Sequence, residues 1–509
     1  MASPQDITNR WPITAALMLA TLMNTLDSTI ANVALPHIQG SVQASADQVT
    51  WVLTSYIIAA AIMTPLSGWL SMRFGRKRVL LASIALFVLA SMACGLATSL
   101  PEIVIFRLIQ GIAGASTIPL SQSLMLDVFP QRMIPTVMAI WSSAIIVGPI
   151  LGPVLGGWLT DNYTWRWVFY INVPIGILAY LGLQLFMADD PGGRQRPFDF
   201  LGFGALVTFI VGFQLMLDRG TDKDWFSSKE IWFECAFAII GLWMFIVQTL
   251  TARDPFFHRD IARDRNFVAT TVFGFFVGAL LFSSTALLPS MMQNLMGFSV
   301  MESGFASMPR GVGSLFAFIA VPLLLRRFGP RPVLFTGLCL SALALWQMHS
   351  FDLSMTAQPI MVSGFIQGLG TGLMFAPLTA LAYVSLAPIH RTEGTIISTM
   401  VRSLGSSAGI SVLQAGVTRQ SAMAHSVLAE RAVPGDPVFT AALPSALNPG
   451  SNLGIQALNG EVTRQAAMIG YDNMFTMMIA MVVIMAPLLL LVRPAPRVVL
   501  VPGEVEAGH

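Results

Sequence analysis

Long apolar runs separated by short polar segments fill the chain from residue 12 to residue 493. A helix of about 20 mostly apolar residues crosses the hydrocarbon core of a bilayer and satisfies its own backbone hydrogen bonds there. The pattern therefore predicts fourteen membrane-spanning helices. They are expected near residues 12–35, 50–70, 79–98, 101–125, 134–159, 167–187, 198–217, 231–250, 266–289, 302–325, 332–350, 358–384, 395–416 and 472–493.

The first apolar run is too long for the apolar core of a signal peptide, and we expect it to remain as the first span. An even number of spans places both termini on one side of the membrane. If that side is cytoplasmic, 18 of the 28 Lys and Arg residues lie on the inner side, 7 on the outer side and 3 within spans. Because basic residues are enriched in cytoplasmic loops, the sequence predicts cytoplasmic termini.

Two short motifs recur at nearly the same distance along the chain. The segment RFGRKRVL begins at Arg73 and its counterpart RFGPRPVL begins at Arg327, an offset of 254 residues. The tripeptide Ile-Gln-Gly at 109–111 recurs at 366–368, an offset of 257 residues. Since many transporters consist of two related halves, spans 9 to 14 are interpreted as a parallel repeat of spans 1 to 6.

The repeat predicts an all-α membrane protein with fourteen helices in a six plus two plus six plan. Residues 1–190 would form the N-terminal six-helix bundle and residues 191–265 an inserted two-helix hairpin with its flanking loops. Residues 266–493 would form the C-terminal bundle, followed by a cytoplasmic tail at 494–509. The segment 417–471 is expected to be a long extracytoplasmic loop, either a functional cap or flexible.

Composition excludes several classes of protein. The chain is 55% hydrophobic and 11% charged, whereas a soluble domain has about 25% charged residues. A net charge of +2 with dispersed basic residues argues against nucleic-acid binding. The three cysteines lie in separate apolar runs, and no histidine has metal-ligand spacing, so we expect no disulfide, no metal and no cofactor.

Two ionisable side chains within spans are the main candidates for chemistry. Asp27 lies eight residues before the outer end of the first apolar run, and Arg107 lies six residues inside the fourth, so both are about 10 Å deep. A buried carboxylate beside a guanidinium can change its proton occupancy with its surroundings, as a coupling site requires. The alternative is a static ion pair that locks the two spans together.

Further polar residues within spans are candidates for substrate contact or for a structural role. Arg310 and Arg402 lie in the second half and have no carboxylate in their own runs except Glu302 at a boundary. Each is expected to bind carbonyl groups, an anionic substrate group or a structural partner. The uncharged candidates are Asn32, Gln110, Asn172 and Gln367.

The fifth apolar run contains a doubled Gly-Pro-x-x-Gly pattern between residues 148 and 157. Glycine at every fourth position forms a flat stripe that permits close helix contact, and proline removes a backbone donor. The pattern predicts a tightly packed and kinked helix. Its residues are Gly148, Pro149, Gly152, Pro153, Gly156 and Gly157.

With these motifs, the chain resembles the major facilitator superfamily, and within it the fourteen-helix drug:proton antiporters of the EmrB/QacA type. The resemblance covers nearly the whole chain and is closest to EmrB-like multidrug efflux subunits. The segments that carry it, besides the Gly-Pro pattern, are 26–36, 68–78, 107–114, 172–176, 217–220 and 224–228.

The resemblance implies roles for particular residues. Asp27 would be the coupling acid and Arg107 its arginine, and residues 148–157 would be the antiporter motif. The family's gating loop would correspond to Gly68, Arg73, Gly75 and Arg76. Met72 occupies the position where the family usually has an acidic residue, so a gating salt bridge through residue 72 is not expected.

The resemblance also implies proton-coupled efflux of amphipathic small molecules from a bacterial inner membrane, with membrane lipid around the spans. A periplasmic adaptor protein and an outer-membrane channel are the implied partners, and the segment 417–471 is the candidate docking site.

Two alternatives differ in function. One is a symporter, or a narrow exporter of a single metabolite or siderophore. The other is a membrane enzyme or sensor. The sequence has no P-loop, because none of its three lysines follows the GxxxxG pattern, and its one GxSxG match, at 405–409, lies in an apolar helical run. We therefore expect a secondary transporter rather than an enzyme.

Overall fold

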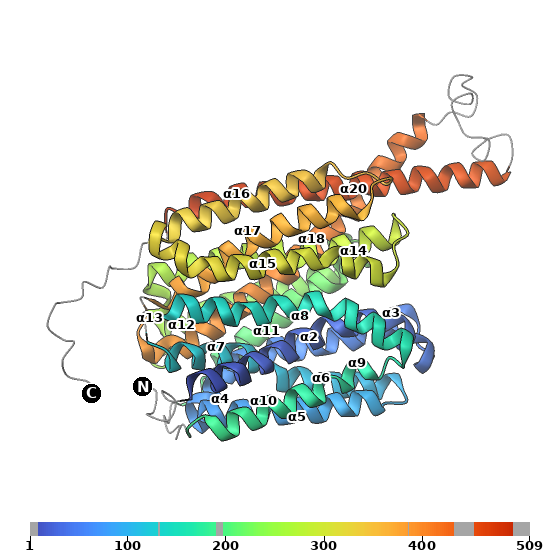
Figure 1. Cartoon of the computed structure of the whole chain (residues 1–509). Coiled ribbons are helices and arrows are strands. Elements are labelled where there is room, and N and C mark those ends of the chain that lie inside the picture. Colours follow the sequence, from blue (N-terminus) through green and yellow to red (C-terminus); the bar gives the residue numbers. More distant parts are fainter. Residues whose placement is uncertain (1–8, 131–132, 190–196, 385, 432–451, 492–509) are drawn as a thin grey trace.

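The computed structural model describes residues 9–130, 133–189, 197–384, 386–431 and 452–491. Within these ranges every regular element is helical, and no strand occurs. Fourteen helices are long and apolar enough to cross a membrane. The predicted number of spans is confirmed, and Figure 1 shows them as one elongated bundle of roughly aligned helices.

The first six spans occupy residues 10 to 186. The fourth span joins α6 and α7, and the sixth joins the short α9 to α10. The elements are α2 (Arg10–Val42), α3 (Ala46–Val49), α4 (Trp51–Phe74), α5 (Arg76–Leu96), α6 (Leu100–Gly114), α7 (Thr117–Val128), α8 (Ile134–Asn162), α9 (Trp167–Tyr170) and α10 (Asn172–Phe186).

The other eight spans follow from residue 200. The elements are α11 (Phe200–Gly220), η2 (Trp225–Ser227), α12 (Lys229–Thr251), α13 (Arg259–Arg263), α14 (Arg265–Asn294), α15 (Val300–Phe328), α16 (Pro330–His349), α17 (Ala357–Val384), η3 (Pro388–His390), α18 (Arg391–Arg431) and α20 (Asn452–Leu488). Most boundaries lie within a few residues of those of the apolar runs, whereas α18 and α20 each extend well beyond their run at one end.

Most helix contacts lie within the first six spans or within the last six. Helix α2 packs against α8 and α10, and α6 packs against α4 and α5. Helix α15 packs on α17, and α18 packs on α14 and α20. Helices α11 and α12 form a pair that also touches α4 and α18 through α11. Helix α8 contacts α15 and α17, so it joins the early part of the chain to the late part.

The two RFG motifs form the same kind of joint. Gly75 separates α4 from α5 with φ 91°, and Gly329 separates α15 from α16 with φ 79°. A residue with a Cβ rarely adopts such a positive φ, whereas glycine does so readily. The motif therefore encodes a sharp break between two consecutive spans at both places.

The predicted loop at 417–471 differs most from the structure. Helix α18 continues to Arg431 and α20 begins at Asn452, so both ends of the expected loop are helical. With 41 and 37 residues these helices are about 60 and 55 Å long, about twice the thickness of a hydrocarbon core. They project beyond the rest of the bundle in Figure 1. Residues 432–451 and the expected tail at 494–509 lie outside the described residues.

Candidate functional site

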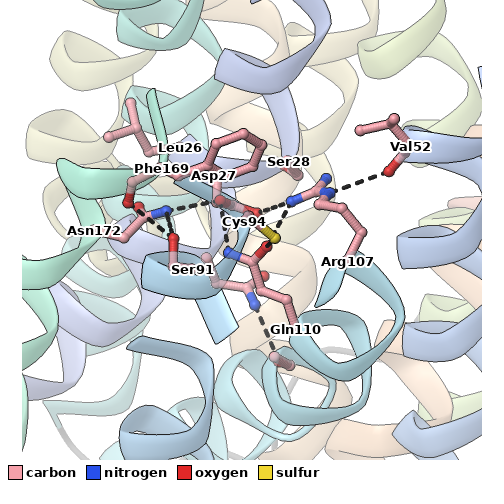
Figure 2. A network of polar contacts seen from close by, with 12 residues as sticks. Leu26, Asp27, Ser28, Val52, Ser91, Cys94, Arg107, Gln110, Phe169 and Asn172 are labelled. Carbon is pink, nitrogen blue, oxygen red and sulfur yellow. Dashed lines mark hydrogen bonds and ion pairs between the residues drawn. The ribbon is translucent and has the colours of Figure 1, made fainter. Parts of the chain in front are cut away.

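Asp27 lies in the middle of α2 and is completely buried. Its carboxylate accepts three hydrogen bonds, from Arg107 Nη1 at 2.7 Å, Gln110 Nε2 at 2.9 Å and Asn172 Nδ2 at 2.7 Å (Figure 2). A buried charge is tolerated only when it is paired and hydrogen-bonded. These three donors therefore satisfy the buried carboxylate of Asp27.

Arg107 on α6 is fixed from several sides. Its side chain is 1% exposed, and its Nε donates to the Val52 carbonyl at 3.1 Å while Nη1 also donates to Gln110 Oε1 at 2.9 Å. The guanidinium carbon lies 4.3 Å from the centroid of the Tyr56 ring, within the range of a cation–π interaction. The arginine thus joins α2, α4 and α6 at one point.

The network extends to α5 and α10. Asn172, the first residue of α10, also donates from Nδ2 to Ser91 Oγ at 3.0 Å, and Ser91 donates to the Phe169 carbonyl at 2.8 Å. The Cys94 thiol donates to Gln110 Oε1 at 3.6 Å. A single buried cluster therefore connects five of the first six spans.

The structure brings four of the residues predicted from sequence into direct contact: Asp27, Arg107, Gln110 and Asn172. Asn32, five residues after Asp27 on the same helix, is exposed and lies outside this cluster. Sequence reasoning missed Ser91 and Tyr56, because single polar residues in apolar runs are common and carry no distinguishing signal.

The glycine stripe of α8 faces the helix that carries Asp27. A Cβ at Gly148 would lie 2.3 Å from Thr25 Oγ1, and a Cβ at Gly152 would lie 2.3 Å from Thr29 Oγ1. At Gly156 it would lie 2.9 Å from Ile30. Only glycine permits this close approach.

The rest of the motif has different surroundings. Gly157 does not face α2, since a Cβ there would lie 3.5 Å from Val300 on α15. Pro149 and Pro153 lie inside α8, where each removes one backbone donor.

A second polar cluster, which we call the inner cluster, joins the ends of three helices. Asp127 at the end of α7 forms ion pairs with Arg76 at the start of α5 and with Arg391 at the start of α18, the latter at 3.4 Å. Beside it, the hydroxyls of Ser123 and Thr392 are hydrogen-bonded at 2.8 Å. The carboxylate is thus shared between cations that are more than 300 residues apart in sequence.

The residues predicted as a gating loop lie around the inner cluster. Gly68 packs close to α18, because a Cβ there would lie 2.7 Å from Ile396 Cδ1. Arg76 binds Asp127, whereas Arg73 is exposed and stacks on the Trp69 ring. Sequence reasoning missed Asp127 and Arg391, because neither stands out within its segment.

The predicted residues of the later spans do not form a comparable cluster. Arg310 is 5% exposed and donates to Thr285 Oγ1 at 3.1 Å, while its Nε has no partner among the described residues. The amide of Gln367, the counterpart of Gln110 in the repeat, is fully buried and also lacks a partner in the described part of the chain.

Arg402 borders a small cavity of about 30 Å³ between α14, α17 and α18. Its guanidinium carbon lies 5.1 Å from the Phe375 ring, and Thr271, Tyr383 and Ser398 also line the cavity. Within the described ranges neither Arg310 nor Arg402 forms an ion pair with a carboxylate.

Known proteins resemble the chain in sequence and in fold. The profile of the Major Facilitator Superfamily matches residues 17–410. The multidrug export protein EmrB of Escherichia coli K12 is 37% identical over 431 residues, which are 84% of this chain and 83% of that protein. The fatty acid resistance protein FarB of Neisseria gonorrhoeae is 34% identical over 430 residues, 83% of each chain.

Two solved structures share the fold at low sequence identity. The human organic anion transporter MFSD10 has a TM-score of 0.58 with 13% identity and covers 94% of this chain and 100% of its own. The proton:xylose symporter XylE has a TM-score of 0.56 with 14% identity and covers 92% of this chain and 94% of its own. At these identities the likeness shows the architecture alone.

Proposed function

Because the chain belongs to the major facilitator superfamily of transporters, we propose that it exports amphipathic small molecules from the cell in exchange for protons. Its relatives of the EmrB type, named as multidrug export proteins, support efflux as the direction. The observation that carries the exchange mechanism is the completely buried carboxylate of Asp27, held by three donors on two other spans.

Charge balance explains how Asp27 acts as the coupling residue. The ionised carboxylate neutralises Arg107, which is itself almost completely buried. A proton on Asp27 removes that negative charge and leaves a buried guanidinium without compensation, which is costly in a low-dielectric interior. The protonated and ionised forms therefore favour different arrangements of α2 and α6, and such a difference is what coupling requires.

The glycine motif carries this change to the rest of the molecule. Helix α2 lies directly on α8 through Gly148 and Gly152, and α8 packs equally closely on α15, where a Cβ at Gly311 would lie 2.2 Å from Ile150. A shift of α2 is thus transmitted across the contact between the first six and the last six spans. We retain the six plus two plus six plan, with cytoplasmic termini, as part of the proposal.

The inner cluster serves as the gate on the cytoplasmic side in this scheme. Asp127 holds the start of α18 against the end of α7 and the start of α5. Substrate entry from the cytoplasm requires that these helix ends separate, so the Asp127–Arg391 contact breaks in the inward-open state. The gate does not involve residue 72, in agreement with the methionine at that position.

A narrower function is the second candidate: export of amphipaths with an anionic end. Arg402 supports it, because this cation borders a cavity and has no carboxylate partner among the described residues. The name of the relative FarB refers to fatty acids, which are anionic amphipaths. Arg402→Ala is expected to reduce transport of an anionic dye more than that of a cationic dye of equal size. Equal losses would favour the broad function.

The projecting ends of α18 and α20 support the proposed tripartite pump in the inner membrane. They contact each other through His425 and Asn459 at 3.2 Å. They expose the apolar side chains of Met423, Val427 and Leu453 to 55%, 50% and 80%. We assign this surface to docking of a periplasmic adaptor, which would connect the transporter to an outer-membrane channel.

Transport in proteoliposomes with an imposed pH gradient tests the proposal. Wild-type protein is expected to drive dye against its gradient only when protons flow the other way, and Asp27→Asn is expected to abolish this uphill transport. Asp161→Asn, which changes an exposed carboxylate near the end of α8, is the matched control and should keep wild-type transport. Uphill transport by the Asp27→Asn protein would remove Asp27 from the coupling role.

A further inference from the structure

The side chains of two histidines and one aspartate lie close together beside the start of α18. His258 precedes α13, Asp260 lies in α13, and His390 ends η3 directly before α18. One ligand atom from each of the three side chains lies within 4.8 Å of the others. His258 and His390 are 132 residues apart in sequence, so no spacing pattern indicated this group.

The geometry points to a binding site for a divalent transition-metal ion of the zinc type, and we propose that His258, Asp260 and His390 are its protein ligands. Two imidazoles and one carboxylate suit zinc, copper or nickel, whereas magnesium and calcium prefer oxygen ligands alone. Three protein ligands leave the remaining coordination positions of the ion to water.

The distances require little rearrangement. In a tetrahedral zinc site with metal–ligand bonds of about 2.0–2.2 Å, the ligand atoms lie about 3.4 Å apart. His258 Nδ1 and Asp260 Oδ2 are already 3.4 Å apart. The rings of His258 and His390 are tilted by 48° to each other with centroids 4.6 Å apart, so a rotation of the partly exposed His390 ring closes the site.

The backbone around the site is held in place. The His258 backbone N–H donates to Glu393 Oε2 at 3.0 Å, and Glu393 is itself 5% exposed in the first turn of α18. The competing contact from Arg263 to Asp260 is 3.6 Å long and exposed, and exposed ion pairs contribute little. A metal ion therefore replaces a weak contact and gains two anchored ligands.

The position of the site suggests what the bound ion does, a consequence that rests on the proposed transport function. His390 is followed directly by Arg391, which binds Asp127 in the inner cluster. His258 belongs to the segment that returns from the α11–α12 pair. A bound ion ties these two segments together and holds the start of α18 where Arg391 reaches Asp127. Metal binding therefore keeps the gate closed and slows export.

Calorimetric titration of zinc into the full-length protein in detergent, purified without a polyhistidine tag and treated with chelator, tests the site. We expect one zinc ion per chain, no binding of magnesium, and at least a tenfold loss of zinc affinity in His258→Ala and in His390→Ala. His425→Ala, which removes a partly exposed histidine on the projecting part of α18, is the matched control and should bind zinc as the wild type does. Equal affinity in the wild type and in the double variant of His258 and His390 would overturn the proposal.

Two further measurements separate binding from folding and from transport. Zinc is expected to raise the melting temperature of the wild type but not of the His390→Ala variant, and the two proteins should melt alike without metal. In proteoliposomes zinc should slow wild-type efflux and leave efflux by His390→Ala unchanged. Tight binding without an effect on efflux would overturn the gating role alone, since the titration does not depend on transport.

Discussion

Gly148→Ala is the sharpest test of the contact between the glycine motif of α8 and helix α2. The new methyl group would lie 2.3 Å from Thr25 Oγ1 and 2.8 Å from the Thr25 backbone carbonyl carbon, whereas ordinary contact begins at 3.4 Å. Rotation of the Thr25 side chain cannot relieve the backbone contact, so α2 and α8 must separate by about 0.6 Å, the difference between 3.4 and 2.8 Å. Overpacking of this kind costs about 1–3 kcal/mol.

The overpacking should appear in two measurements, the melting temperature and the rate of efflux. The separation also weakens the Thr25 hydrogen bond to the Ala144 carbonyl, now 3.2 Å long, and displaces Asp27 two residues further along α2. We expect a melting temperature lowered by a few degrees and a severalfold slower coupled efflux. Gly157→Ala is the control, because its methyl group fits at 3.5 Å from Val300. Equal behaviour of the two variants would refute the close packing of α8 on α2.

Three other variants have defined outcomes. Asn172→Ala removes one of the three hydrogen bonds to Asp27 and should lower the free energy of unfolding by about 1.5–3 kcal/mol, measured by thermal or denaturant unfolding; an unchanged stability would contradict the bond. Asp127→Asn removes the negative charge that Arg76 and Arg391 share and should weaken inner closure about tenfold, measured as faster labelling of a cytoplasmic-side cysteine; slower labelling would contradict the gate. Leu453→Asp should reduce co-purification with the adaptor while efflux in proteoliposomes stays normal; unchanged co-purification would contradict the docking surface.

The number of spans was predictable because membrane helices need long apolar runs, and each run in this chain is separated from the next by polar residues or glycine and proline. The extensions of α18 and α20 were not predictable by the same rule. Segments such as 417–431 are polar and therefore fail a hydrophobicity criterion, yet they are rich in alanine and other good helix formers. Their helical structure follows from propensity and mutual packing rather than from lipid.

The buried cluster around Asp27 was partly predictable, since charged residues within spans are rare and their similar depths indicated proximity. Gln110 and Asn172 were candidates, but nothing in their sequence context indicated that both donate to Asp27. The hydrogen bond from Arg107 to the Val52 carbonyl could not be predicted, because the backbone group that lies beside the guanidinium depends on how α4 packs on α6. For the same reason the pairing of Asp127 with Arg391 required the tertiary structure.

Proton release on substrate binding is the most direct test of the central claim, that export is coupled to the protonation of Asp27. Substrate is added to wild-type protein in weakly buffered detergent solution, and released protons are measured with a pH indicator. The wild type and the Asp161→Asn control are expected to release protons in proportion to bound substrate, and Asp27→Asn is expected to bind substrate without releasing any. Equal proton release by the Asp27→Asn protein would contradict the account.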